Sequence, residues 1–141
     1  MENSAALKIL IADDERDILE IMAKKILEAG YQVTTAQDGE EALAKIKSED
    51  PDVILLDLNM PKLDGFGVLK RIRESPPSPK WQPVIIISAR TDLDDMKKGF
   101  SLEADHYIPK PCNITDVLKG IKLMINLIPQ RKLSEEGEKD R

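Results

Sequence analysis

Hydrophobic residues in this chain fall into short runs, and the runs are separated by longer stretches in which apolar positions recur every three or four residues. Runs of four or five aliphatic residues are typical of strands buried on both faces, and the wider spacing is typical of helices with one apolar face. Their alternation predicts a parallel sheet covered by helices on both sides. The predicted strands lie near residues 8–12, 32–36, 53–56, 84–88 and 106–108.

Five helices are predicted between and after these strands. The first shows the helical spacing most clearly, at Leu19, Met22, Ala23, Ile26 and Leu27. We predict helices over residues 17–29, 40–47, 65–73, 92–102 and 114–127. Asn113 or Thr115 should cap the last helix, and we expect that helix to stop at Pro129, because proline lacks the N–H that continues a helix.

The length of 141 residues fits a single domain with one hydrophobic core. We assign residues 1–128 to that domain. Residues 129–141 are polar and charged, so we expect a mobile C-terminal tail or the start of a linker. The proline-rich stretch 75–83 cannot form a regular helix and is expected to be a long surface loop.

Composition and charge narrow the classes of partner. Aromatic residues make up only 4% of the chain, so the core must be aliphatic. The net charge of −5 argues against nucleic acid or an anionic membrane as a direct partner. A lone Cys112 excludes an internal disulfide, and no secretory leader is visible, so we expect a cytoplasmic protein. No apolar run approaches the roughly 20 residues that a membrane-spanning helix needs.

Polar residues stand where several of the predicted strands end. Asp57 closes the run at 53–56, Asp13 and Asp14 follow the first strand, Ser88 ends the fourth, and Lys110 follows the fifth between two prolines. The carboxyl ends of parallel strands meet at one edge of the sheet, which is where open α/β folds bind ligands. The sequence therefore predicts one pocket that holds carboxylates, a hydroxyl and an ammonium group.

The acids of this pocket need compensation. Two like charges at about 4 Å cost on the order of 4 kcal/mol at an effective dielectric constant near 20. A bound cation or raised pKa values would relieve that cost, and Mg²⁺ favours carboxylate, water and phosphate oxygens. Two simpler interpretations stay open here: Asp13 and Asp14 could only cap the first helix, and Lys110 could be an ordinary surface lysine.

These residues, in this order, resemble the receiver domain of two-component response regulators. The resemblance spans roughly residues 7–127 and is carried by Asp13-Asp14, Asp57-Leu58-Asn59-Met60-Pro61, Asp64-Gly65, Ser88-Ala89, Tyr107 and Lys110-Pro111. It implies a flavodoxin-like (βα)5 three-layer sandwich, an α/β fold whose five parallel strands have the order 2-1-3-4-5.

The resemblance also implies roles for individual residues. Asp57 would accept a phosphoryl group from a phosphohistidine of a sensor histidine kinase or histidine phosphotransfer protein. Asp14 and Asp57, with the backbone carbonyl of Asn59, would ligate Mg²⁺, and Asp13 would do so directly or through water. The phosphoryl oxygens would be bound by Ser88, the amide of Ala89, and Lys110.

A movable Ser88 hydroxyl and Tyr107 ring would act as the switch and change the surface of the fourth helix, fifth strand and fifth helix for a downstream protein. Such a protein catalyses only its own phosphorylation and dephosphorylation. Two positions depart from the family pattern: Glu103 replaces a usual glycine, and Cys112 replaces a usual phenylalanine.

Other classes of protein also fit part of this pattern. An aspartate-nucleophile phosphatase of the haloacid-dehalogenase type uses a strand-end acid with Mg²⁺, but there a second Asp usually stands where this chain has Asn59. A flavodoxin-like cofactor binder would need Gly, Ser and Thr amides after the first strand, where this chain has acids. A receiver-shaped module that never takes phosphate would not need the full set of acids, hydroxyl and lysine.

Overall fold

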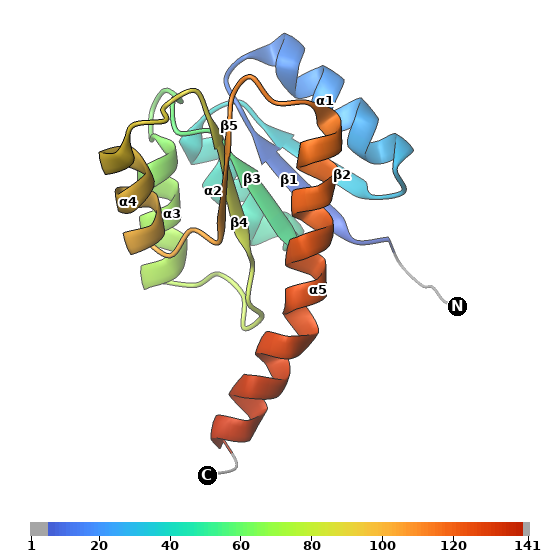
Figure 1. Ribbon diagram of the computed structural model, residues 1–141, viewed down its shortest axis with the longest axis vertical. Coiled ribbons are helices and arrows are strands. Elements are labelled where there is room, and N and C mark those ends of the chain that lie inside the picture. The colour runs from blue at the N-terminus through green and yellow to red at the C-terminus, as the bar shows by residue number, and fades with distance from the viewer. Residues whose placement is uncertain (1–5, 140–141) are drawn as a thin grey trace.

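The computed structural model describes the backbone of residues 6–139 and the side chains of residues 6–129. Five parallel strands form one sheet in the order β2-β1-β3-β4-β5, as predicted (Figure 1). The strands are β1 (Lys8–Ala12), β2 (Gln32–Ala36), β3 (Val53–Leu56), β4 (Val84–Ser88) and β5 (His106–Pro109). The flavodoxin-like (βα)5 architecture is therefore confirmed.

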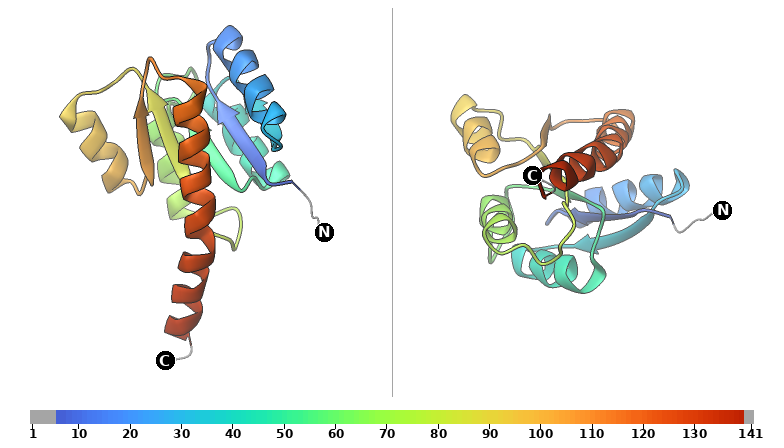
Figure 2. Two further views of the ribbon diagram at one scale, coloured as in Figure 1. Left: turned by 45° about the vertical axis from the view of Figure 1, so that its right-hand side comes forward. Right: turned by 90° about the horizontal axis from the view of Figure 1, so that it is seen from below.

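Helices cover both faces of the sheet (Figure 2). The five helices are α1 (Arg16–Glu28), α2 (Gly39–Glu49), α3 (Gly65–Glu74), α4 (Leu93–Ser101) and α5 (Ile114–Lys139). α1 and α5 pack on one face, and α2 and α3 pack on the other. α4 lies beside the β5 edge and packs Met96 and Leu102 against the core on the α2 and α3 side.

The core divides into two clusters because successive residues of a strand point to opposite faces of the sheet. In β1, Ile9 and Ile11 pack with α1 and α5, whereas Leu10 and Ala12 pack with α2 and α3. All four side chains are at most 2% exposed. Burial on both faces explains why β1, β3 and β4 contain uninterrupted aliphatic runs.

The apolar spacing predicted α1 correctly, although the side chain of Leu27 within it is 54% exposed. The predicted end of the last helix is corrected. α5 does not stop at Pro129; it continues to Lys139 with the proline inside it. Proline removes only one hydrogen bond of the helical ladder, so it weakens a helix without necessarily ending it. Asn113 caps α5 by accepting from the N–H of Asp116 at 2.9 Å, as expected.

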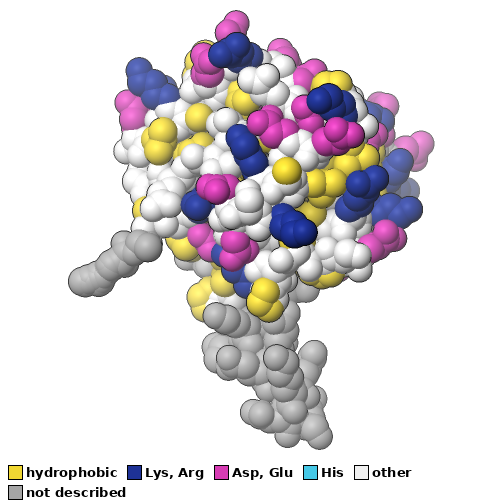
Figure 3. All heavy atoms as spheres, turned by 180° about the vertical axis from the view of Figure 1, so that it is seen from behind, with side chains coloured by type: hydrophobic (Ala, Val, Ile, Leu, Met, Phe, Trp, Pro, Cys, Tyr) yellow, Lys and Arg dark blue, Asp and Glu magenta, His cyan; other side chains and the backbone are white. Residues whose placement is uncertain are grey.

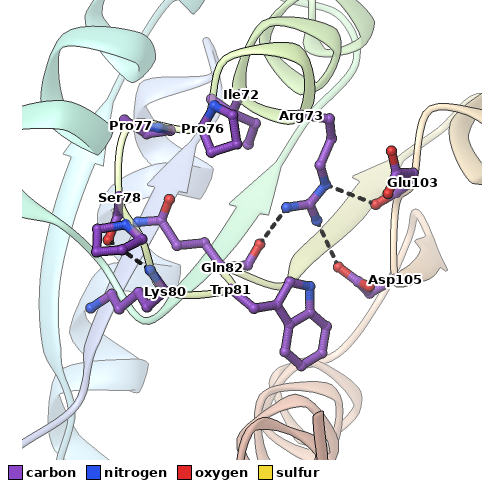
Figure 4. A pocket seen from close by; sticks show the side chains of 11 residues that line it. Ile72, Arg73, Pro76, Pro77, Ser78, Lys80, Trp81, Gln82, Glu103 and Asp105 are labelled. Atoms are coloured by element: carbon purple, nitrogen blue, oxygen red, sulfur yellow. Dashed lines mark hydrogen bonds and ion pairs between the residues drawn. The ribbon is translucent and has the colours of Figure 1, made fainter. Parts of the chain in front are cut away.

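The proline-rich loop lies at the amino end of the sheet, between α3 and β4, and borders a cavity of about 760 Å³ (Figure 4). Arg73 of α3 ties the loop down: it donates to the carbonyl of Gln82 at 2.9 Å and to the carboxylate of Asp105 at 2.9 Å. Lys80 in the loop donates to Asp52 at 2.9 Å. Both contacts hold the carboxyl-terminal part of the loop, at residues 80 and 82.

The surface carries charges of both signs. Figure 3 shows basic and acidic side chains interspersed on the side covered by α2 and α3. In the part of the chain that the structure describes, no helix combines the length and the apolar character needed to cross a membrane.

Candidate functional site

The sheet brings the predicted strand-end residues to one edge. The backbone N–H of Asp57 donates to the carbonyl of Ala12 at 2.9 Å, and the N–H of Lys110 donates to the carbonyl of Ser88 at 2.8 Å. These bonds continue the ladder one residue beyond the strands. The residues that follow β1 and β3 therefore leave the sheet side by side, and Lys110 leaves the same edge one strand farther along, beyond β4.

Lys110 joins the two buried acids of the pocket. Its Nζ lies 2.8 Å from Oδ2 of Asp13 and 3.0 Å from Oδ2 of Asp57. The carboxylate of Glu15 is farther away, at 3.9 Å. The side chain of Lys110 is 14% exposed, so it is not an ordinary surface lysine. Its position supports the interpretation in which an ammonium group faces the strand-end acids.

Three carboxylates gather in this pocket. One oxygen each from Asp13, Asp14 and Asp57 lies within 4.8 Å of the others. Asp13 and Asp57 are buried, whereas Asp14 is exposed. Against these three negative charges stands the single positive charge of Lys110, so the pocket has a net charge of about −2 when all four are ionised. A divalent cation with oxygen ligands matches both the charge and the donor atoms.

Burial changes the ionisation of the pocket. It raises the pKa of Asp57, and the nearby Asp13 adds to that rise, although hydrogen bonds from Lys110 and from the Asn59 N–H partly oppose it. Burial alone would lower the pKa of Lys110, but its hydrogen bonds to Asp13 and Asp57 outweigh that effect and raise it. Lys110 therefore stays protonated and supports the charged form of Asp57.

The acids after β1 serve the pocket. Oδ1 of Asp13 accepts from the backbone N–H of Glu15 at 2.9 Å, and Oδ2 accepts from Lys110. Together these two contacts fix the orientation of the Asp13 carboxylate. Glu15 is the N-cap of α1, yet its side chain makes no capping bond. The carboxylate of Glu15 therefore does not cap the helix.

The backbone around Asp57 is tightly packed. The N–H of Asn59 donates to Oδ1 of Asp57 at 3.2 Å, and the N–H of Gly65 donates to the carbonyl of Leu58 at 3.0 Å. A Cβ on Gly65 would lie 2.4 Å from the carbonyl oxygen of Asp57, so only glycine fits at this position. α3 therefore begins directly beside the strand-end acid.

Ser88 and Tyr107 both bind the backbone of Arg90. Oγ of the fully buried Ser88 accepts from the N–H of Arg90 at 3.1 Å, and the hydroxyl of Tyr107 donates to the carbonyl of Arg90. The Tyr107 ring lies inward and is 7% exposed, and burial raises the pKa of its hydroxyl. Ala89, between Ser88 and Arg90, is exposed.

Sequence reasoning missed Arg90. Its guanidinium lies 3.0 Å from the carboxylate of Asp95 and 3.3 Å from Oδ1 of Asn59, so it closes one side of the site. A basic residue two positions after Ser88 was the available signal. Nothing in the spacing indicated which of the acids 92, 94 or 95 it would contact.

The comparisons with known proteins agree with this geometry. The profile of the response regulator receiver domain matches residues 9–122. The chain is a response regulator receiver domain. Receiver domains are phosphorylation-dependent switches, and nothing found here supports the alternative of a haloacid-dehalogenase-type phosphatase.

Similar proteins include transcriptional regulators. A probable transcriptional regulator, ycf27, of Porphyridium aerugineum is 44% identical over 121 residues, which cover 86% of this chain and 49% of that protein. The alkaline phosphatase synthesis transcriptional regulatory protein PhoP of Bacillus subtilis is 38% identical over 118 residues, covering 84% of this chain and 48% of that protein. The chain thus spans about half the length of the curated relatives it matches.

Solved receiver structures match nearly their whole length. A CheY-like receiver domain protein from Methanospirillum hungatei has a TM-score of 0.83 at 28% identity, covering 90% of this chain and 99% of that one. CheY in a CheX-CheY-BeF3-Mg²⁺ complex from Borrelia burgdorferi has a TM-score of 0.77 at 30% identity, covering 84% of this chain and 89% of that one. That complex contains both Mg²⁺ and the beryllium fluoride anion BeF3.

Proposed function

We propose that Asp57 is the phosphoacceptor of this receiver domain. Asp57 follows the central strand β3, so it lies between the acids that follow β1 and Ser88 at the end of β4. Its carboxylate has one oxygen on the ammonium of Lys110 and the other on the Asn59 N–H. In the transfer, a carboxylate oxygen of Asp57 forms a bond to phosphorus while the phosphorus–nitrogen bond of a phosphohistidine breaks. The bonding electron pair returns to the ring nitrogen of the donor.

The acidic cluster fits Mg²⁺. We assign the carboxylates of Asp14 and Asp57 and the backbone carbonyl of Asn59 as ligands, with Asp13 acting directly or through water. Two buried acids, one exposed acid and a net charge of about −2 support this assignment. When bound, Mg²⁺ neutralises charge on the transferred phosphoryl oxygens.

Lys110, Ser88 and the amide of Ala89 are assigned to the remaining phosphoryl oxygens. Lys110 already lies 3.0 Å from the acceptor carboxylate. Ser88 would exchange its bond with the Arg90 N–H for one with the phosphoryl group, and Tyr107 would respond because its hydroxyl binds the same residue. Water then attacks phosphorus, the bond to the Asp57 oxygen breaks, and inorganic phosphate leaves.

The donor would be a sensor histidine kinase or histidine phosphotransfer protein in the cytoplasm, and the output would pass to a downstream protein through the face of α4, β5 and α5. Leu93 and Phe100 on α4 and Leu123 on α5 support this output face, because each is a large hydrophobic side chain between 48% and 66% exposed. No direct contact with nucleic acid or membrane is assigned to this domain.

Incubation with acetyl phosphate and Mg²⁺ tests the proposal. Intact-protein mass spectrometry should show one added phosphoryl group that hydroxylamine removes, as expected for an acyl phosphate. Asp57→Asn should abolish the labelling and chelation of Mg²⁺ should prevent it. Asp52→Asn, which removes an acid at the opposite end of the sheet, should leave labelling intact.

Two results would contradict the proposal. Labelling that persists in Asp57→Asn would place the phosphoryl group elsewhere. Continuous turnover of varied phosphoesters, without a stable phosphorylated form, would indicate a phosphatase instead of a switch.

A further inference from the structure

Arg90 connects α4 to the acid pocket through its side chain. Its Nη2 and Nε donate to the two carboxylate oxygens of Asp95, at 3.0 and 3.2 Å, and Asp95 lies in the first turn of α4. A further nitrogen donates to Oδ1 of Asn59 at 3.3 Å. The guanidinium also lies 5.4 Å from the ring centroid of Phe66 in α3. Paired contacts of this kind hold a planar guanidinium in one orientation.

The backbone of the same residue carries the two switch contacts. The N–H of Arg90 donates to Ser88, and its carbonyl accepts from the hydroxyl of Tyr107. A side chain fixed by Asp95 therefore also fixes the peptide groups that Ser88 and Tyr107 recognise. If the guanidinium moved, the acceptor for Tyr107 would move with it.

A second path leads directly to the phosphoacceptor. Arg90 binds the side chain of Asn59, and the N–H of Asn59 donates to Oδ1 of Asp57 at 3.2 Å. Three successive hydrogen-bonded contacts thus join Asp95 to Asp57. The side chain of Asp95 is 19% exposed and that of Arg90 is 38% exposed, so water screens the pair only in part.

We infer that Asp95, acting through Arg90, is a positioning residue of the acid pocket: it holds Asn59 and the acceptor for Tyr107 in place and so sets how tightly the pocket holds a phosphoryl group. This inference rests on the proposed function of Asp57. By linkage, whatever displaces Asp95 from Arg90 weakens the grip on the phosphoryl group, and phosphorylation in turn stabilises the position of α4.

Binding of beryllofluoride with Mg²⁺, measured by calorimetry, tests this inference, because the anion takes the place of a phosphoryl group on a carboxylate. Asp95→Asn should weaken binding about fivefold, the equivalent of one partly exposed ion pair. Arg90→Ala should weaken it at least as much, and the double variant no further than Arg90→Ala alone, since both act through one contact. Asp95→Glu should retain most of the affinity.

Asp94→Asn is the matched control, because it removes an equal charge from an exposed position in the same turn of α4. It should bind beryllofluoride as the wild type does. A role of Asp95 confined to helix stability would lower the urea midpoint of both variants alike and leave their affinities equal.

Equal affinity of Asp95→Asn and wild type, or additive losses in the double variant, would overturn the inference while the proposed function stands. Failure of the wild type to bind, or unchanged binding in Asp57→Asn, would overturn the proposed function and the inference together.

Discussion

Both ends of the sheet carry a lysine in contact with two aspartates, but the two lysines differ in how far water reaches them. At the carboxyl end, Lys110 binds Asp13 and Asp57 with its side chain 14% exposed. At the amino end, Lys80 binds Asp52 at 2.9 Å and Asp50 at 3.4 Å with its side chain 35% exposed. Each lysine thus has two aspartates, and the main difference is access of water.

That difference separates a reactive site from a structural one. Lys80 neutralises its partners where solvent already screens them, so its contacts tie down the proline-rich loop and add little energy. Lys110 works among buried acids that outnumber it, and the remaining negative charge makes the pocket ready to bind a cation and a phosphoryl group. A lysine–aspartate contact thus holds a loop in place at the amino end of the sheet. At the carboxyl end, the same kind of contact leaves a net negative charge.

Replacing each lysine with methionine sharpens this contrast most. In Mg²⁺-free buffer at neutral pH, Lys110→Met should lower the free energy of unfolding by about 3 kcal/mol, because two buried carboxylates lose their counter-ion. Lys80→Met should lower it by only about 0.5 kcal/mol. Urea unfolding followed by fluorescence of Trp81, the only tryptophan, measures both.

The loss in Lys110→Met should shrink as the pH falls and the carboxylates become protonated. Added Mg²⁺ should also reduce it, since a cation at the acids replaces part of the missing charge. Equal losses in the two variants would show that burial does not distinguish the two ends.

Neutralising Asp57 at the carboxyl end of the sheet and Asp52 at the amino end should change the free energy of unfolding in opposite directions. Burial raises the pKa of Asp57 in the folded protein, so the fold favours the protonated carboxyl and its ionisation costs stability. That cost is absent below the ordinary pKa of the carboxyl and complete above the raised one. Asp57→Asn should therefore raise the free energy of unfolding by about 1 kcal/mol at neutral pH, and the gain should vanish in acid.

Asp52→Asn should instead destabilise, because Asp52 accepts from Lys80 and from the backbone N–H of Lys8 at 2.8 Å. Thermal unfolding of both variants across a pH series in chelator distinguishes the two cases. A loss of stability in Asp57→Asn at neutral pH would mean that Lys110 fully compensates the burial of that acid.

The sequence predicted which residues gather at the carboxyl end of the sheet, but it did not predict the contacts of Arg90 beside them. Asp13, Asp57 and Lys110 could be placed together because each follows a predicted strand, and parallel strands end at one edge. The contact of Arg90 with Asp95 depends on how α4 is oriented, which no periodicity encodes. The end of α5 was predicted wrongly because proline weakens a helix without fixing where it stops.

The smallest predicted effect concerns the turn at the amino end of β5. Glu103 follows α4 with φ of 70°, a left-handed conformation that favours glycine, and thus keeps the bend despite replacing the family's usual residue. The N–H groups of Glu103 and Ala104 bind the carbonyls of Phe100 and Gly99, each at 3.0 Å.

Glu103→Gly should relieve that strain and raise the free energy of unfolding by about 0.5 kcal/mol, after the entropy that glycine adds to the unfolded chain is subtracted. Urea unfolding measures the change, and Gly30→Ala is the reciprocal control, because Gly30 closes α1 with φ of 102° and should lose stability. Arg73 binds the backbone carbonyl of residue 103, so that contact survives the substitution. Since the turn lies at the end remote from Asp57, labelling by acetyl phosphate should be unchanged; altered labelling would show that the two ends of the sheet are coupled.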